Sequence, residues 1–274
     1  KSGGGGASTS IVSNGSDSAN VRENVALAFA NVACDKSVRG TLVASGGVRV
    51  LLNLCAHTDE NTEKCRRHAA HALAKILITT NPRLLPDAKL MDCVKPVILL
   101  CKNASDELQE FEGLMALTNI ASVDDAAKKC IVHHGGLPVI EYLQFEDNHM
   151  IRRAATEAIC NVAGAGDNAV GREVARRISH KQRVRLWVAL MDREEFGQDL
   201  PTAEAATATL ALTGHEPSVA AALVTADGGL ETLIKNASCA SNPGLQHRAA
   251  AAIRAVLLAA TDDGDREEGE DEKE

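Results

Sequence analysis

The chain has 274 residues, of which 45% are apolar and only 2% are aromatic, and its formal net charge is −8. The apolar fraction excludes a wholly disordered chain, and the few aromatic residues argue against a β-sandwich or β-barrel, whose sheets depend on aromatic and β-branched side chains. Most of the negative charge lies in residues 262–274. The rest of the chain is nearly neutral, so nucleic acid is not an expected partner.

In chain order, the composition predicts three parts. Residues 1–20 are rich in glycine, serine and asparagine and predict a flexible linker. Residues 21–261 are rich in alanine and leucine and predict helices throughout, with Pro96 expected near a helix start, where proline is tolerated. Residues 262–274 hold nine acidic and two basic side chains and predict a disordered acidic tail.

Hydropathy and cysteine spacing indicate a cytoplasmic protein. No apolar run reaches the roughly 18 residues that a membrane helix needs, so we expect no membrane partner. The eight cysteines form no C-x-x-C pair and are scattered through the helical patterns, which is typical of reduced thiols in the cytosol.

Six alanine-rich segments, each with one apolar anchor, recur along the helical part. The steps between successive anchors are 44, 44, 42, 51 and 43 residues. A period near 40–47 residues with several helices in each repeat is typical of armadillo and HEAT proteins. The six anchors are Phe29, Leu73, Leu117, Ile159, Leu210 and Ile253.

Three glycine pairs keep phase with these anchors, at residues 46–47, 135–136 and 228–229, each starting 17 or 18 residues after an anchor. Glycine adopts a positive φ at little cost, so each pair can end one helix and turn the chain into the next. The two markers together predict an all-α, armadillo-repeat, right-handed superhelical solenoid of about five to six repeats with a concave groove.

The predicted partner-binding groove follows from one repeat position. The residue two after the anchor is Asn31, Lys75, Asn119 or Asn161 in the first four repeats, and an asparagine amide there can donate to and accept from an extended peptide backbone. An alternative is that some of these asparagines cap or cross-link neighbouring helices. Steps of four residues keep to one helix face, and we expect the resulting columns to be exposed: Arg67–His71–Lys75, Phe111–Met115–Asn119 and Arg153–Glu157–Asn161.

No catalytic, cofactor or metal site is predicted. The sequence has no phosphate loop, dinucleotide fingerprint, nucleophile elbow or H-E-x-x-H motif, so we do not expect an enzyme. Cys65, His68 and His71 could approach a zinc ion only partly, because the third position drifts off the helix face and a fourth ligand is missing. The basic segment 171–185 is either a solvated helix face or a contact for an anionic partner or the acidic tail.

The blocks AAHALAKILITTNP (69–82), LQEFEGLMALTNIAS (108–122) and FEDNHMIRRAATEAICNVA (145–163) resemble the UCS domain of the Unc-45-type myosin chaperones. The resemblance covers about residues 21–260. It implies a cytosolic co-chaperone that binds the myosin motor domain and assists its folding and assembly. It also implies Hsp90 as a partner, mainly through an N-terminal domain that we expect to lie outside this sequence. The family's client groove maps most plausibly to Asn119, Arg152, Arg153 and Asn161.

Two other functions fit an armadillo fold. A general scaffold for cytoskeletal or signalling partners would use the same groove and needs a client test to distinguish it. Nuclear-import adaptors carry a tryptophan four residues before each groove asparagine, whereas the residues here are Leu27, Met115 and Glu157. The myosin chaperone therefore remains the leading hypothesis and the scaffold its alternative.

Overall fold

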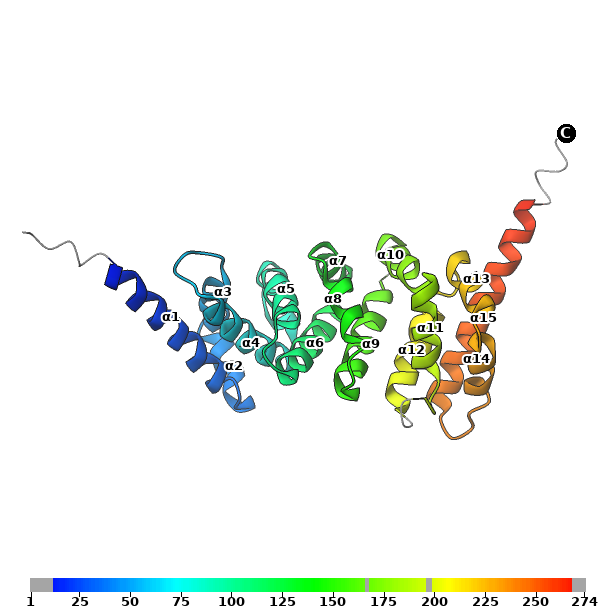
Figure 1. The fold of residues 1–274 in the computed structure, drawn as a ribbon, viewed down its shortest axis with the longest axis horizontal. Coiled ribbons are helices and arrows are strands. Elements are labelled where there is room, and N and C mark those ends of the chain that lie inside the picture. The colour runs from blue at the N-terminus through cyan, green and yellow to red at the C-terminus, as the bar shows by residue number, and fades with distance from the viewer. Residues whose placement is uncertain (1–11, 166–167, 196–198, 268–274) are drawn as a thin grey trace, which may run out of the picture. The chain divides into compact units, whose positions relative to one another are not determined.

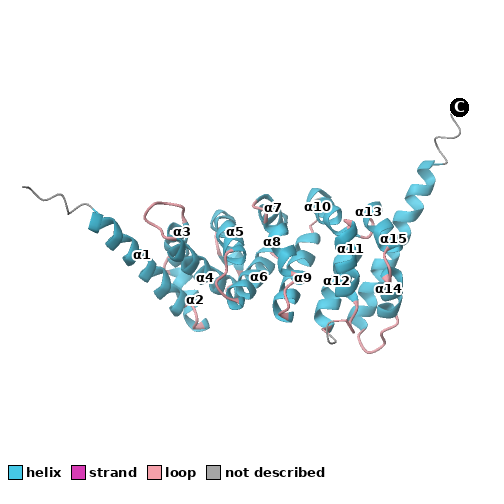
Figure 2. Ribbon diagram, viewed as in Figure 1, coloured by secondary structure: helices cyan, strands magenta, loops and turns pink. Residues whose placement is uncertain are grey.

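The computed structural model describes residues 12–165, 168–195 and 199–267, and across these ranges every regular element is a helix (Figures 1 and 2). The predicted all-α class is confirmed. The chain divides into two compact units, one up to Ile120 and the other from Ala121 onward. None of the helices in the described ranges is both long and apolar enough to cross a membrane.

The first unit contains six α-helices and one short 3-10 helix in its described part. Helix α1 packs on α4, and α3 packs on both α4 and α5. The elements are α1 (Val12–Val32), α2 (Lys36–Ala44), α3 (Gly47–Cys55), α4 (Glu63–Thr79), η1 (Pro82–Leu84), α5 (Asp87–Lys102) and α6 (Glu107–Ala121).

The second unit repeats a pattern of two short helices followed by a longer one. The longer helices stack, since α12 packs on both α9 and α15. The elements are α7 (Asp125–His133), α8 (Gly136–Leu143), α9 (His149–Ala163), α10 (Asn168–Ile178), α11 (Lys181–Met191), α12 (Leu200–Thr213), α13 (Pro217–Thr225), α14 (Gly229–Ala237) and α15 (Pro243–Glu267).

The apolar anchors form the core of these repeats. Leu73, Leu117, Ile159 and Leu210 are fully buried on α4, α6, α9 and α12, and small alanines surround them and let the helices approach closely. The first and last anchors, Phe29 and Ile253, are only half-buried. The sequence period therefore corresponds to one armadillo repeat.

Each glycine pair turns the chain as predicted, and its two members have different roles. The first glycines, Gly46, Gly135 and Gly228, have φ of 81°, 74° and 73°, in the left-handed region that glycine favours. In two of the pairs the second glycine lies against backbone. A Cβ on Gly47 would lie 2.7 Å from the carbonyl oxygen of Leu42, and one on Gly229 would lie 2.2 Å from that of Leu223. Short helices can therefore follow one another almost without a loop.

Three sequence-based boundaries differ from the structure. Helix α1 begins at Val12, so residues 12–20 of the predicted linker are helical, because an established helix extends at low cost into neighbouring residues. For the same reason α15 continues to Glu267, into the predicted tail. Residues 1–11 and 268–274 lie outside the described residues. Pro96 lies inside α5 and not near its start, because buried residues on both sides of it hold the helix against the core.

Candidate functional site

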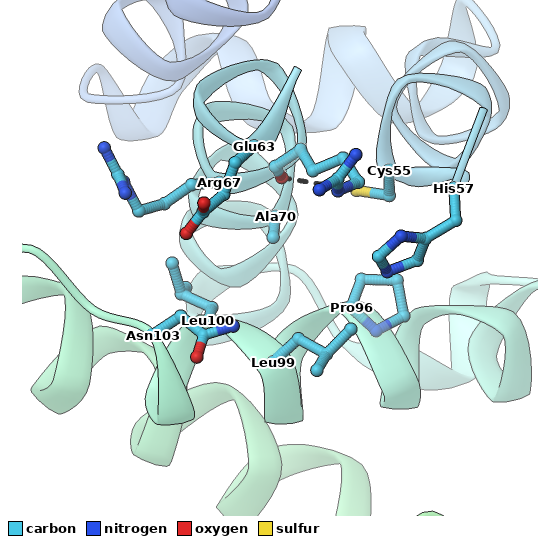
Figure 3. Close-up of a pocket in the computed structure, with 10 residues that line it drawn as sticks. Cys55, His57, Glu63, Arg67, Ala70, Pro96, Leu99, Leu100 and Asn103 are labelled. Atoms are coloured by element: carbon cyan, nitrogen blue, oxygen red, sulfur yellow. Dashed lines mark hydrogen bonds between the residues drawn. The ribbon is translucent and has the colours of Figure 1, made fainter. Parts of the chain in front are cut away.

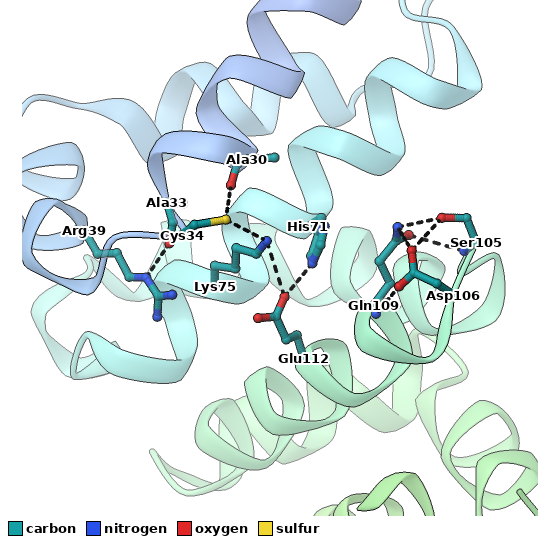
Figure 4. A network of polar contacts seen from close by, with 10 residues as sticks. All are labelled: Ala30, Ala33, Cys34, Arg39, His71, Lys75, Ser105, Asp106, Gln109 and Glu112. Atoms are coloured by element: carbon teal, nitrogen blue, oxygen red, sulfur yellow. Dashed lines mark hydrogen bonds and ion pairs between the residues drawn. The ribbon is translucent and has the colours of Figure 1, made fainter. Parts of the chain in front are cut away.

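Lys75 lies on α4 with only 6% of its surface exposed. Its Nζ donates to Cys34 Sγ at 3.5 Å and lies 3.6 Å from Glu112 Oε2 on α6. His71 Nε2 lies 2.5 Å from the same carboxylate oxygen, so Glu112 joins both side chains, as Figure 4 shows. The prediction that this column is exposed was wrong for His71 and Lys75. A charged side chain can be buried when an opposite charge and hydrogen bonds compensate it.

The environment of Glu112 keeps its carboxylate ionised. Burial by itself would raise the pKa of this carboxyl group. The hydrogen bond to His71 and the positive charges of Lys75 and Arg39 outweigh that effect, and the pKa of Glu112 is lowered from its ordinary value. The position predicted as a groove contact is therefore part of a buried charge cluster between α4 and α6.

The remaining predicted residues of the first unit have different environments. The side-chain nitrogen of Asn119 donates to the carbonyl oxygens of Leu77 and Ile78 at 3.0 and 2.9 Å. It thereby caps the C-terminal turn of α4, whose last carbonyls have no partner within the helix. This is the cross-linking alternative considered for such asparagines. Asn31 on α1 is exposed and Met115 on α6 is half-buried.

Arg152 faces inward, with 8% of its surface exposed. Its guanidinium donates to the carbonyl oxygens of Glu146 and Asp147 at 2.9 and 3.4 Å. These contacts hold the loop that precedes α9. Arg152 therefore stabilises this loop inside the repeat, and its place in a client groove stays a prediction.

Three predicted residues of α9 do come together at one cavity. Arg153, Glu157 and Asn161 line a cavity of about 320 Å³ in the second unit. They lie one helical turn apart, which places them on the same face of α9. The other walls come from α12 and α15, and the cavity is also lined by Cys160, Pro201, Glu204, Ala205, Ala208 and Arg248. We call this space the α9–α12–α15 cavity.

Two ion pairs face this cavity. Arg153 Nε donates to Glu157 Oε1 at 2.8 Å along α9. Glu204 of α12 accepts from Arg248 of α15 at 2.5 Å and from the side-chain nitrogen of Asn242 at 2.5 Å. The two cations balance the two anions, and all four charged side chains are between 29% and 40% exposed. The cavity is therefore lined by both hydrogen-bond donors and acceptors.

The floor of the cavity is small and unreactive. Ala205 and Ala208 line it together with Cys160. Burial raises the pKa of the Cys160 thiol, although Thr209 and the charge of Arg248 act in the opposite direction. The thiol is therefore uncharged at neutral pH, and thiols in this form are poor nucleophiles.

Glu204 and Arg248 are site residues that the sequence-based reasoning missed. The signal for Glu204 was present, since it lies six positions before its anchor Leu210, just as Arg153 lies six positions before Ile159. The predicted groove rests on the asparagine position instead, where these two later repeats carry Leu212 and Ala255. The polar column continues along α12 at the repeat position of Arg153, and along α15 at Arg248, which lies five positions before the anchor Ile253.

Several arginines of the basic segment 171–185 serve the second unit internally. Arg177 and Arg183 both contact Glu141 Oε2, at 2.6 and 3.0 Å, and Glu141 is buried on α8. Arg176 pairs with Glu173 at 2.8 Å on the same helix. The excess positive charge of the segment is thus partly compensated inside the repeat.

Comparison with known proteins finds chains of similar sequence. No family model matches the chain. Protein unc-45 homolog B of Xenopus laevis is 34% identical over 194 residues, which are 70% of this chain and 20% of that protein. The homologue from Danio rerio is 32% identical over 230 residues, 83% of this chain and 23% of that protein. The chain thus spans about a fifth of the length of these relatives.

Solved structures agree with the sequence relatives. UNC-45 from Drosophila melanogaster matches with a TM-score of 0.78 and 30% identity over 90% of this chain and 30% of that chain. An UNC-45 chaperone studied for binding and folding muscle myosin matches with a TM-score of 0.75, 22% identity, and coverage of 88% and 26%. A designed armadillo repeat protein shares the fold, with a TM-score of 0.65 and 22% identity. The chain therefore has an armadillo-repeat fold and is similar, in sequence and in fold, to a stretch of the Unc-45 proteins.

Proposed function

We propose that this chain acts as a myosin-directed co-chaperone region that binds the myosin motor domain. The observation that supports it most is the similarity to Unc-45 proteins across most of this chain, both in sequence and in fold. One solved relative of the same fold is an UNC-45 chaperone that binds and folds muscle myosin. Hsp90 is a predicted second partner, through a domain outside this sequence.

The α9–α12–α15 cavity is the proposed client contact. Its paired charges and the Asn161 amide suit a partly folded, extended segment, whose backbone offers N–H and C=O groups at regular intervals. Binding would be non-enzymatic. A surface that binds an unfolded or intermediate form preferentially lowers the concentration that is free to aggregate. In the first unit, exposed Asn31 and half-buried Met115 remain candidates for additional contacts.

The test is light scattering of a heated myosin motor domain, with this chain at equal molar amounts and with an unrelated aggregating protein as the control client. We expect the chain to suppress scattering of the myosin motor domain only. Suppression for both clients would indicate a generic apolar surface. Suppression for neither, with the chain shown to be folded by circular dichroism, would favour the alternative of a general scaffold for cytoskeletal or signalling partners.

A further inference from the structure

A second depression lies in the first unit, between α3, α4 and α5. It shares no residue with the buried charge cluster of His71, Lys75 and Glu112. It consists of two cavities of about 300 and 380 Å³. Four residues line both cavities, so the two are continuous. The shared residues are Cys55, His57, Pro96 and Leu99. We call this depression the α3–α5 groove. Figure 3 shows α4 and α5 facing each other across its first part, with His57 beside Pro96.

The floor of the groove is apolar. Ala70 of α4 and Leu99 and Leu100 of α5 line it. Burial raises the pKa of the Cys55 thiol to about 12, so this side chain is neutral and behaves as a small apolar group. A cavity of this size lined by such residues accommodates one apolar side chain of a ligand.

The rim of the groove is positively charged. Four lysines and arginines line the two cavities against two acids, Glu63 and Asp92. Asp92 is already paired with Lys89 at 3.2 Å. The Nε of Arg67 is buried and has no hydrogen-bond partner among the described residues. Lys95 is exposed on the same helix as Lys89. Negative charge on a ligand would therefore be attracted to this rim.

Pro96 removes one helical donor from α5 beside the groove. It lies inside α5 and has no N–H, so it cannot donate the helical hydrogen bond to the carbonyl oxygen of Asp92. Both Pro96 and Asp92 line the second cavity. An N–H group of a bound chain can supply the donor that the helix does not.

We propose that the α3–α5 groove binds an extended acidic segment of a partner protein that carries one apolar side chain. The apolar side chain enters the cavity over Ala70 and Leu99, and flanking carboxylates contact Arg67 and Lys95. This site lies outside the residues assigned to myosin binding, so it does not depend on the proposed function. Its ligand differs as well, since the α9–α12–α15 cavity has balanced charges and this groove has an excess of positive charge.

The experiment is a fluorescence anisotropy titration of the full chain with the labelled peptide Glu-Asp-Leu-Ser-Asp-Glu. Peptides with lysine at the acidic positions, or with glycine at the leucine position, serve as comparisons. Lys95→Glu should weaken binding of the acidic peptide about tenfold, because reversal removes an attraction and adds a repulsion. Lys36→Glu makes the same charge change on exposed α2, outside the groove, and should leave the affinity unchanged. Added salt should weaken binding.

Three outcomes would overturn the proposal. The first is equal affinity for the acidic and basic peptides. The second is an equal loss of affinity in Lys95→Glu and Lys36→Glu, which would show only long-range attraction by the whole chain. The third is binding that occurs only after residues 262–274 are deleted, because the natural occupant would then be this chain's own acidic end. Circular dichroism of each variant shows that it is folded, and Arg67→Gln provides a second, independent change in the rim.

Discussion

His71 on α4 and Glu112 on α6 lie 41 positions apart in the sequence, and their side chains meet at 2.5 Å inside the first unit. Lys75, one turn further along α4, lies 3.6 Å from the same carboxylate oxygen. The acidic side chain of Glu112 thus pairs with two basic side chains of the repeat before it. A repeat position that looks like a binding contact can in this way become a contact between repeats.

Glu112→Gln should destabilise the first unit by about 3 kcal/mol, because it leaves the buried ammonium of Lys75 without its opposite charge. Urea denaturation followed by far-ultraviolet circular dichroism measures the free energy of unfolding. Asp59→Asn is the matched control, since it also removes one carboxylate but from an exposed loop residue. Equal stability of the two variants would mean that Lys75 finds another partner or reaches water.

The same carboxylate should make stability depend on pH. The folded-state pKa of Glu112 is lowered below its ordinary value of 4.5, so the unfolded chain binds more protons in that range. Its contribution is therefore complete above about pH 4.5 and is lost as the pH falls through the lower folded-state value. We expect the loss of stability in acid to be shallower in Glu112→Gln than in the unchanged protein. Denaturation at a series of pH values between about 3 and 7 measures this slope.

In the α9–α12–α15 cavity, Arg153→Ala combined with Asn161→Ala should weaken binding of the myosin motor domain with little change in the melting temperature. The Arg153–Glu157 pair is partly exposed, and pairs of this kind contribute about 0–1 kcal/mol to stability. Arg176→Ala is the control, because it removes an exposed arginine with its own ion pair outside the cavity. If the double variant lost thermal stability together with binding affinity, Arg153 and Asn161 would act only through the fold.

Two glycines of the second unit should respond to alanine in opposite directions. Gly229→Ala places a Cβ 2.2 Å from the carbonyl oxygen of Leu223 and should destabilise by more than about 1 kcal/mol. Gly171→Ala on α10 meets no atom within 4 Å and should stabilise by about 0.5–1 kcal/mol. The fluorescence of Trp187, the one tryptophan of the chain and 2% exposed, follows unfolding of this unit. Similar effects of both changes would contradict the close packing at Gly229.

Much of the fold could be predicted from the sequence. The period of the anchors and the three glycine pairs specify helix, turn and repeat, because each depends on local spacing and on the backbone freedom of one residue. The cavity residues of α9 were also found from spacing, since Arg153, Glu157 and Asn161 lie on one helix face whatever surrounds it. The ends of α1 and α15 were missed, because a helix can extend through residues that have low intrinsic preference for it.

The environment of each polar side chain was decided by the tertiary structure. Helical spacing places Lys75 and Asn161 at equivalent repeat positions. Lys75 meets a carboxylate from the next repeat and is buried with it, whereas Asn161 is half-buried and lines the α9–α12–α15 cavity. Asn119, at the same position again, meets the open carbonyls at the end of α4. Spacing along one chain determines which face a residue occupies. Burial and ion pairing depend on what the neighbouring helix brings to that face, and those neighbours are brought together only when the repeats pack.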